Sequence, residues 1–147
     1  MDTARLLADV KSAEGCRLQA YRDTLGFWTI GYGHRLPEGK DWSGLTWTQD
    51  QADQQLSTDL SRNGYLPAMQ LPEWQFLDTD ARQNAVAELC FNMGVGHWRA
   101  FAQTRLCIRR KDWQGAHDGL LDSAWAKEVG PNRANRLANY LLSGTFD

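Results

Sequence analysis

The chain has 147 residues, 42% of them hydrophobic, and 16 basic and 18 acidic side chains that give a net charge of −2. This length suits one folded domain, and the mixture of apolar and charged residues excludes an intrinsically disordered chain. Because no segment is strongly basic, the charge pattern also argues against a nucleic-acid-binding protein.

The first third of the sequence predicts one helix followed by a small sheet. Residues 3–14 carry apolar side chains at helical spacing, and Gly15 directly after them is a helix stop. Residues 17–36 are rich in aromatic and β-branched residues interrupted by glycines, which predicts a small antiparallel sheet with a tight turn near residues 24–26. We expect residues 37–47 to form a loop or a short third strand.

The remainder of the sequence predicts helices. Thr48 and Gln51 have the spacing of a capping box, which opens a helix over about residues 49–63. The narrow apolar stripe of that helix is typical of a connector between lobes, and Gly64 and Pro67 are expected to end it. A further helix is predicted after Asp78 or Thr79 as the cap, with Gly94 past its end, and others over about 97–109, after Asp112 and from Pro131.

Two carboxylates stand out because they come from different predicted elements. Glu14 lies in the last turn of a helix, where the helix dipole disfavours a negative charge, and Asp23 lies in the sheet. Hydrolysis of a glycosidic bond needs a proton donor and a second carboxylate on the other side of the sugar. Each of these residues also has a simpler interpretation without catalysis. Glu14 could be an ordinary exposed glutamate, Asp23-Thr24 could only form a turn, and Thr29 could be an ordinary strand residue.

The run EGCRLQAYRDTLGFWTIGYGH, from Glu14 to His34, resembles the signature of the phage-type lysozymes, also called endolysins or muramidases. In that signature an Asp follows the Glu by nine positions and a Thr follows the Asp by six, in an aromatic-rich hairpin ending in Gly-x-Gly-His. The similarity continues over nearly the whole chain, in residues 48–59, 91–94, 131–134 and 143–146.

The resemblance implies a lysozyme-like α+β fold. In this fold a connecting helix joins a small antiparallel sheet lobe to a larger helical lobe, and the active site lies in the cleft between them. We therefore expect residues 1–147 to form a single domain. Its β-containing lobe with the connecting helix would span residues 15–64, and its helical lobe would combine residues 1–14 with 65–147.

The resemblance also implies a reaction, which is hydrolysis of the β-1,4 bond between N-acetylmuramic acid and N-acetylglucosamine in bacterial peptidoglycan, without a cofactor. Glu14 would be the general acid, Asp23 would stabilise positive charge at the anomeric carbon or help to activate water, and Thr29 would hold the attacking water. Because the family inverts configuration, the two carboxyl groups should lie about 6.5–9.5 Å apart.

Further roles follow from the resemblance alone. His34 and Asp59 would form a structural pair that ties the sheet to the connecting helix, and Arg133 would reach the catalytic glutamate from the other lobe. Substrate contacts are expected at Gly33, Arg35, Phe91, Asn92 and Arg133. The sequence departs from the family in residues 126–130 and in the shortened stretch after the hairpin, which carries Trp42 and Trp47.

The remaining special residue types predict no metal site. The spacing of His34, His97 and His117 matches no common metal site. An odd count of three cysteines is a poor disulfide framework, so we expect Cys16, Cys90 and Cys107 to be reduced and buried. Trp98, Trp113 and Trp125 are expected in the core. The basic run Arg105, Arg109, Arg110 and Lys111 is read as a solvated helix face, with binding of anionic wall polymers as the alternative.

The expected partner is bacterial peptidoglycan, with no nucleic acid and no stable membrane association, and the protein is expected to be a monomer. The sequence contains no signal peptide or transmembrane segment, which predicts synthesis in the host cytoplasm and action on the cell wall after release. The resemblance adds a holin-type delivery partner. Two rival functions remain at this point, a metal-dependent wall amidase or peptidase and a non-catalytic wall-binding module.

Overall fold

The computed structural model describes all residues from 1 to 147, and they divide into two compact units. One unit comprises Ala4–Ser61, and the other comprises Met1–Thr3 together with Arg62–Asp147. Contacts therefore group residues 4–14 with the sheet, whereas the sequence prediction placed them with the helical lobe. The predicted mixture of helices with a small antiparallel sheet is confirmed.

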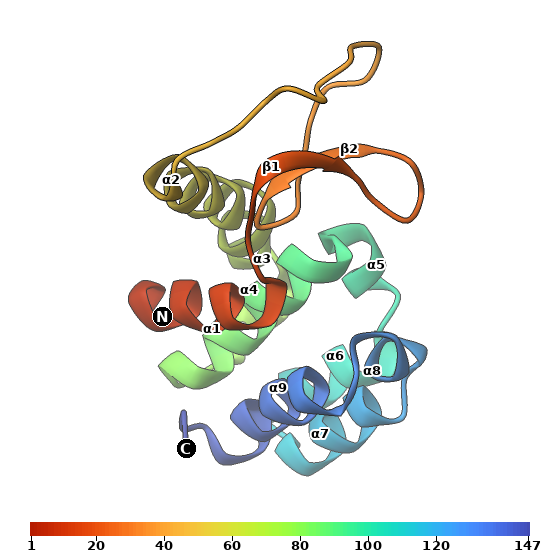
Figure 1. Cartoon of the computed structure of the whole chain (residues 1–147). Coiled ribbons are helices and arrows are strands. Elements are labelled where there is room, and N and C mark those ends of the chain that lie inside the picture. Colours follow the sequence, from red (N-terminus) through yellow and green to blue (C-terminus); the bar gives the residue numbers. More distant parts are fainter. The chain divides into compact units, whose positions relative to one another are not determined.

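The unit Ala4–Ser61 contains the sheet, and its strands follow each other in chain order. Helix α1 (Thr3–Glu14) leads into β1 (Arg17–Arg22), β2 (Trp28–Gly31) and β3 (His34–Arg35), which form an antiparallel sheet of order β1-β2-β3 (Figure 1). The third strand precedes residues 37–47. That stretch is a loop, which is one of the two expected alternatives, and within it only Thr46 forms a bridge, to Gln19.

Helix α2 (Gln49–Leu60) closes this unit and packs against β2 and β3. The predicted capping box is present at its start, with Thr48 accepting from the backbone of Gln51 and Gln51 accepting from the backbone of Thr48. The predicted apolar stripe is buried as well. A small core gathers on one face of the sheet, formed by Ala20, Ile30 and Leu36 with Trp28, Trp42, Leu45 and Trp47 packed against them.

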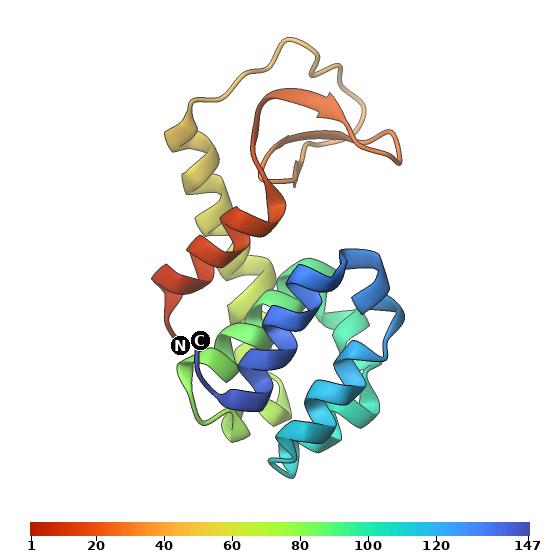
Figure 2. The same cartoon turned by 60° about the horizontal axis from the view of Figure 1, so that its bottom comes forward.

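The other unit is entirely helical. Helices α4 and α7 both pack against α9, and Figure 2 shows α9 alongside them. Helix α4 is buried along most of its length. None of the helices in the chain combines the length and apolarity that crossing a lipid bilayer requires. In order, the elements are η1 (Ser61–Tyr65, a π-helical turn), α3 (Leu66–Met69), η2 (Pro72–Phe76, a 3₁₀ helix), α4 (Asp80–Met93), α5 (Val95–Arg99), α6 (Ala102–Arg109), α7 (Trp113–Leu121), α8 (Ala124–Val129) and α9 (Pro131–Ser143).

Two predicted helix boundaries are wrong. Gly64 and Pro67 do not end the helical run, because Gly64 is accommodated in η1 and Pro67 occupies the first turn of α3, where its missing N–H costs nothing. The single helix expected over residues 97–109 is two helices, α5 and α6, and the chain between them turns at Phe101, whose ψ of 58° is not helical.

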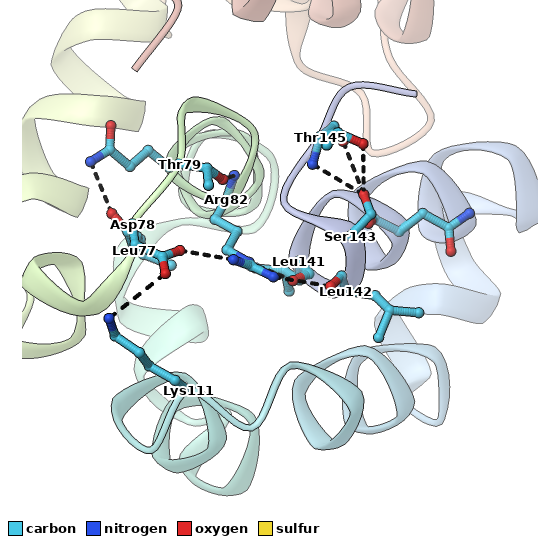
Figure 3. A network of polar contacts seen from close by, with 11 residues as sticks. Leu77, Asp78, Thr79, Arg82, Lys111, Leu141, Leu142, Ser143 and Thr145 are labelled. Carbon is cyan, nitrogen blue, oxygen red and sulfur yellow. Dashed lines mark hydrogen bonds and ion pairs between the residues drawn. The ribbon is translucent and has the colours of Figure 1, made fainter.

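Arg82 links the start of α4 to the end of α9 (Figure 3). Its guanidinium donates to the carbonyl oxygens of Leu141 at 2.8 Å and Leu142 at 3.0 Å, and also to Asp78 at 2.8 Å. The last carbonyls of a helix have no partner within the helix, and a cation is favourable at this end of the helix dipole. One buried side chain therefore completes the C-terminus of α9 and holds two helices together.

The expected environments of cysteine and tryptophan are only partly correct. All three cysteines are free, but only Cys90 is buried, and Cys16 is exposed. Burial raises the pKa of the Cys90 thiol to about 12, so this cysteine is an inert core residue. Trp98 and Trp125 are buried in the helical core as expected, and Trp113 packs partly buried against it.

Candidate active site

Glu14 is the last residue of α1, and the residue after it explains why the helix ends there. Gly15 has a φ of +68°, a left-handed conformation that glycine adopts without strain, and its N–H donates to the Lys11 carbonyl at 3.4 Å. Glu14 is half-buried. The helix end therefore fixes the backbone of Glu14 immediately before the chain enters the sheet.

Asp23 lies in the turn of the β1–β2 hairpin, and its own side chain shapes that turn. Its Oδ1 accepts from the backbone N–H groups of Leu25 and Phe27, each at 2.9 Å, and its N–H donates to the Phe27 carbonyl at 2.8 Å. Gly26 completes the predicted tight turn with a φ of +88°. One carboxylate oxygen is thus committed to the fold, and Oδ2 makes no hydrogen bond within the chain.

Thr29 lies in β2 and is 4% exposed. Strand alternation places it on the face opposite Trp28 and Ile30, which belong to the small core. Its hydroxyl donates to the Phe27 carbonyl at 3.0 Å. Because the only proton of the hydroxyl is used in this bond, Oγ1 can act toward any other partner only as an acceptor.

Arg35 and Gly33 lie next to Thr29 in the sheet. Arg35 is the direct cross-strand partner of Thr29, and its guanidinium carbon lies 3.9 Å from the centre of the Phe27 ring. Gly33 lies in the exposed turn between β2 and β3, with open space where a Cβ would point. The hairpin therefore brings Asp23, Thr29 and Arg35 into one small region of the sheet.

The predicted contact between His34 and Asp59 is present. His34 Nδ1 lies 2.7 Å from Asp59 Oδ2, which connects β3 to α2, and Gln55 donates to the other Asp59 oxygen at 2.9 Å. Both members of the pair are mostly shielded from solvent. The contact is established by the geometry, whereas its purely structural role stays a prediction.

Phe91 and Asn92 belong to the helical unit, at the C-terminal end of α4, and both are half-buried. The indole N–H of Trp125 donates to Asn92 Oδ1 at 2.7 Å. This bond fixes the orientation of the amide, and the Asn92 Nδ2 group makes no hydrogen bond within the chain. Asn92 thus has an oriented donor group available for a ligand.

Arg133 lies in α9 and binds a buried carboxylate that the sequence analysis did not single out. Its Nε donates to Glu88 Oε2 at 2.9 Å, and Arg136 donates to both Glu88 oxygens at 3.0 and 2.8 Å. Glu88 is fully buried in α4. The sequence feature that could have indicated this buried carboxylate is a charged residue inside the apolar run from Ala85 to Cys90. The role expected for Arg133 toward Glu14, which belongs to the other unit, stays a prediction.

A second unpredicted network lies beside α1. The Tyr32 hydroxyl donates to Asp53 Oδ1 at 2.8 Å, Gln49 donates to both groups, and Lys11 lies 3.4 Å from Asp53 Oδ2. Burial and the neighbouring Asp53 raise the pKa of Tyr32 to about 12, so Tyr32 stays a neutral donor. Because Lys11 is one turn before Glu14, this network helps to fix the end of α1.

The histidines are dispersed. His34 pairs with Asp59, His117 lies 2.7 Å from Asp118, and His97 contacts the Phe101 ring. No group of three or more His, Cys, Asp or Glu side chains is arranged to hold a metal ion.

Comparison with known families relates this geometry to a known class of enzyme. The model of the phage lysozyme family matches residues 11–139, a range that contains every candidate site residue. The chain belongs to the phage lysozyme family. It is therefore a glycoside hydrolase that acts on peptidoglycan, with the mixed α+β fold of its family.

Similar proteins occur both alone and inside larger chains. The probable T4-type lysozyme 1 of Dictyostelium discoideum is 26% identical over 94% of both chains. An endolysin of Acyrthosiphon pisum secondary endosymbiont phage 1 is 33% identical over 82% of this chain and 78% of its own. The pre-baseplate central spike protein Gp5 of Enterobacteria phage T4 is 28% identical over 91% of this chain, which spans only 27% of that larger protein.

Proposed function

We propose that this lysozyme cuts the β-1,4 bond between N-acetylmuramic acid and N-acetylglucosamine, with Glu14 as general acid and Asp23 as the second carboxylate. The observation that carries this proposal is the hairpin, which holds one oxygen of Asp23 with two backbone N–H groups and leaves the other unbonded within the chain. A carboxylate held in this way keeps its orientation without help from the substrate.

Thr29 would position the attacking water. Since its proton is donated to the Phe27 carbonyl, the hydroxyl oxygen can only accept a hydrogen from that water. If the second hydrogen of the water pointed to Asp23, a lone pair of the water would face the anomeric carbon. This arrangement suits inversion, for which the carboxyl groups of Glu14 and Asp23 should lie about 6.5–9.5 Å apart.

We also propose that Gly33, Arg35, Phe91, Asn92 and Arg133 contact the glycan. The position of Arg35 opposite Thr29, the open surroundings of Gly33 and the oriented amide of Asn92 support this assignment. Amide and guanidinium donors suit the hydroxyl and acetamido oxygens of the sugars.

The direct test of the acid is Glu14→Gln, which keeps the size of the side chain but removes the proton that is transferred. We expect a folded protein whose hydrolysis of peptidoglycan falls by at least about a hundredfold. Glu128→Gln, at an exposed position of α8, is the matched control and should keep full activity. Substantial hydrolysis by Glu14→Gln would remove Glu14 from the role of acid.

Inversion has its own test, because the two stereochemical courses give different first products. Proton NMR of a fresh digest should detect the α-anomer of the new muramic acid end before mutarotation mixes the anomers. If the β-anomer appeared first, the enzyme would retain configuration, and Asp23 would have to be considered as a nucleophile.

For its biological setting, we propose that the protein is a monomer, is synthesised in the cytoplasm of a bacterial host, and reaches the wall with the help of a holin-type pore. The endolysin relative supports this setting. Expression in bacteria should cause rapid lysis only when a pore-forming protein is co-expressed, and equally rapid lysis without one would contradict the proposed delivery.

A further inference from the structure

A shallow pocket lies along α2, apart from Glu14, Asp23 and Thr29. Its volume of about 320 Å³ is near the lower end of the range for small-molecule sites. Every lining side chain belongs to the unit Ala4–Ser61, and none of them carries a charge. They are one aromatic, three amides and one hydroxyl, namely Trp47, Gln51, Gln54, Gln55 and Thr58.

The aromatic member of the pocket is held in place by the chain. A Cβ on Gly31 would lie 3.1 Å from the ring of Trp47, so only glycine allows the indole to pack this closely on the backbone. The His34 ring lies 5.7 Å from the Trp47 ring, centre to centre, and His34 is itself held by Asp59. The indole therefore offers a flat surface that needs little ordering when a ligand binds.

The polar members are partly oriented as well. Gln51 accepts from the Thr48 backbone with its amide oxygen, which leaves its NH₂ group as a donor. Gln55 donates to Asp59 with its NH₂ group, which leaves its amide oxygen as an acceptor. The side chains of Gln54 and Thr58 make no hydrogen bond within the chain. The pocket thus presents one oriented donor, one oriented acceptor and two uncommitted polar groups.

We propose that this pocket binds an N-acetylhexosamine unit of a glycan strand, away from the bond that is cut. The apolar face of a sugar ring packs on an aromatic ring, and amide and hydroxyl groups pair with sugar hydroxyls and with the acetamido group. A peptide stem of the wall carries carboxylates and an ammonium group, which a pocket without charges would leave unpaired.

Such a site would hold the enzyme on its insoluble substrate between cuts. Two binding sites on one strand raise the effective concentration of the second site, so even a weak contact prolongs residence. The identification of the glycan as peptidoglycan rests on the proposed function, whereas binding of N-acetylated sugar by the pocket is a separate claim.

The test uses the whole Glu14→Gln protein, labelled with ¹⁵N and titrated with chitotetraose, a neutral β-1,4-linked tetramer of N-acetylglucosamine. We expect saturable NMR shifts at the Trp47 indole N–H and at the Gln54 side-chain amide. Gln54→Ala and Thr58→Ala, each made in the Glu14→Gln protein, should weaken binding at Trp47 about fivefold, the loss typical of one hydrogen bond. Gln103→Ala, at an exposed position of α6, is the matched control.

Three outcomes would overturn the pocket assignment. The first is that chitotetraose causes no shifts at Trp47 and Gln54. The second is that both pocket variants bind chitotetraose with unchanged affinity while their spectra remain dispersed and folded. The third is that a free stem peptide causes the shifts and chitotetraose does not. None of them depends on turnover. Failure of the proposed function would instead appear in a peptidoglycan digest by the wild-type protein, as freed peptides with intact glycan strands, so the two failures are distinguishable.

Discussion

At the scale of single residues, the role of Asp23 in closing the hairpin turn can be separated from its proposed catalytic role. Its Oδ1 closes the turn through Leu25 and Phe27, and its remaining oxygen and its charge are available for chemistry. A substitution that keeps an oxygen at Oδ1 should therefore preserve the turn, and a substitution that removes the whole group should disturb it.

Asp23→Asn supplies the same acceptor without the charge. We expect it to unfold at the wild-type temperature while its activity on peptidoglycan falls by about a hundredfold or more. Asp23→Ala should lose activity and also about 1–2 kcal/mol of unfolding free energy, because the two backbone N–H groups lose their acceptor. Thermal unfolding and turnover, measured on both variants, would separate the effect on stability from the effect on activity. Full activity of Asp23→Asn would exclude the proposed catalytic role of Asp23.

The sequence could single out these candidate residues but not all of their interactions. Glu14, Asp23 and Thr29 stand at a motif spacing that a local reading detects. The direction of the Thr29 proton depends on the carbonyl of Phe27, which only the folded hairpin brings within reach. Glu88 was missed because its arginine partners are 45 and 48 residues away in the chain.

At the scale of elements, local signals predicted the long helices and the hairpin, and failed for short segments. The capping box of α2 and the turn around Gly26 were correct because neighbouring residues determine both. Helices α3, α5 and α8 have four to six residues, too few to show an apolar period. Their positions come from packing against α4 and α9.

The basic run after residue 104 shows how packing changes the reading of a sequence. It was read as a solvated helix face, but Arg105 turns inward to Glu73, a fully buried residue of η2. Arg105 Nε lies 2.7 Å from Glu73 Oε1, which also accepts from the Trp98 indole at 2.9 Å. Burial alone would raise the pKa of Glu73, but the bonds from Arg105 and Trp98 outweigh it and hold this pKa below the ordinary value of 4.5.

This lowered pKa predicts a dependence of stability on pH. Because the folded state favours the charged form of Glu73, its contribution is complete above about pH 4.5 and is lost as the pH falls through the lower pKa of the folded state. Glu73→Gln should cost about 3 kcal/mol at neutral pH, and this difference should shrink below pH 4.5. Urea unfolding between pH 7 and pH 3 measures it, and a difference that stays constant would contradict the assignment.

At the scale of the whole molecule, the chain combines two compact units, and the family match extends across both. The proposed catalytic residues Glu14, Asp23 and Thr29 belong to the sheet unit, whereas the proposed substrate contacts Phe91, Asn92 and Arg133 belong to the helical unit. Contacts group residues 4–14 with the sheet unit, whereas the resemblance placed them with the helical lobe, because sequence periodicity assigns elements but not the contacts between them. That residues 1–147 act as one domain stays a prediction.

The measurement that tests the central claim most directly is mass spectrometry of purified peptidoglycan digested by the protein and then reduced with borohydride. Hydrolysis after N-acetylmuramic acid predicts saturated disaccharide-peptides that end in muramitol. Intact glycan strands with freed peptides would contradict the account, because they would mean that an amidase or peptidase site, and not Glu14 and Asp23, performs the reaction.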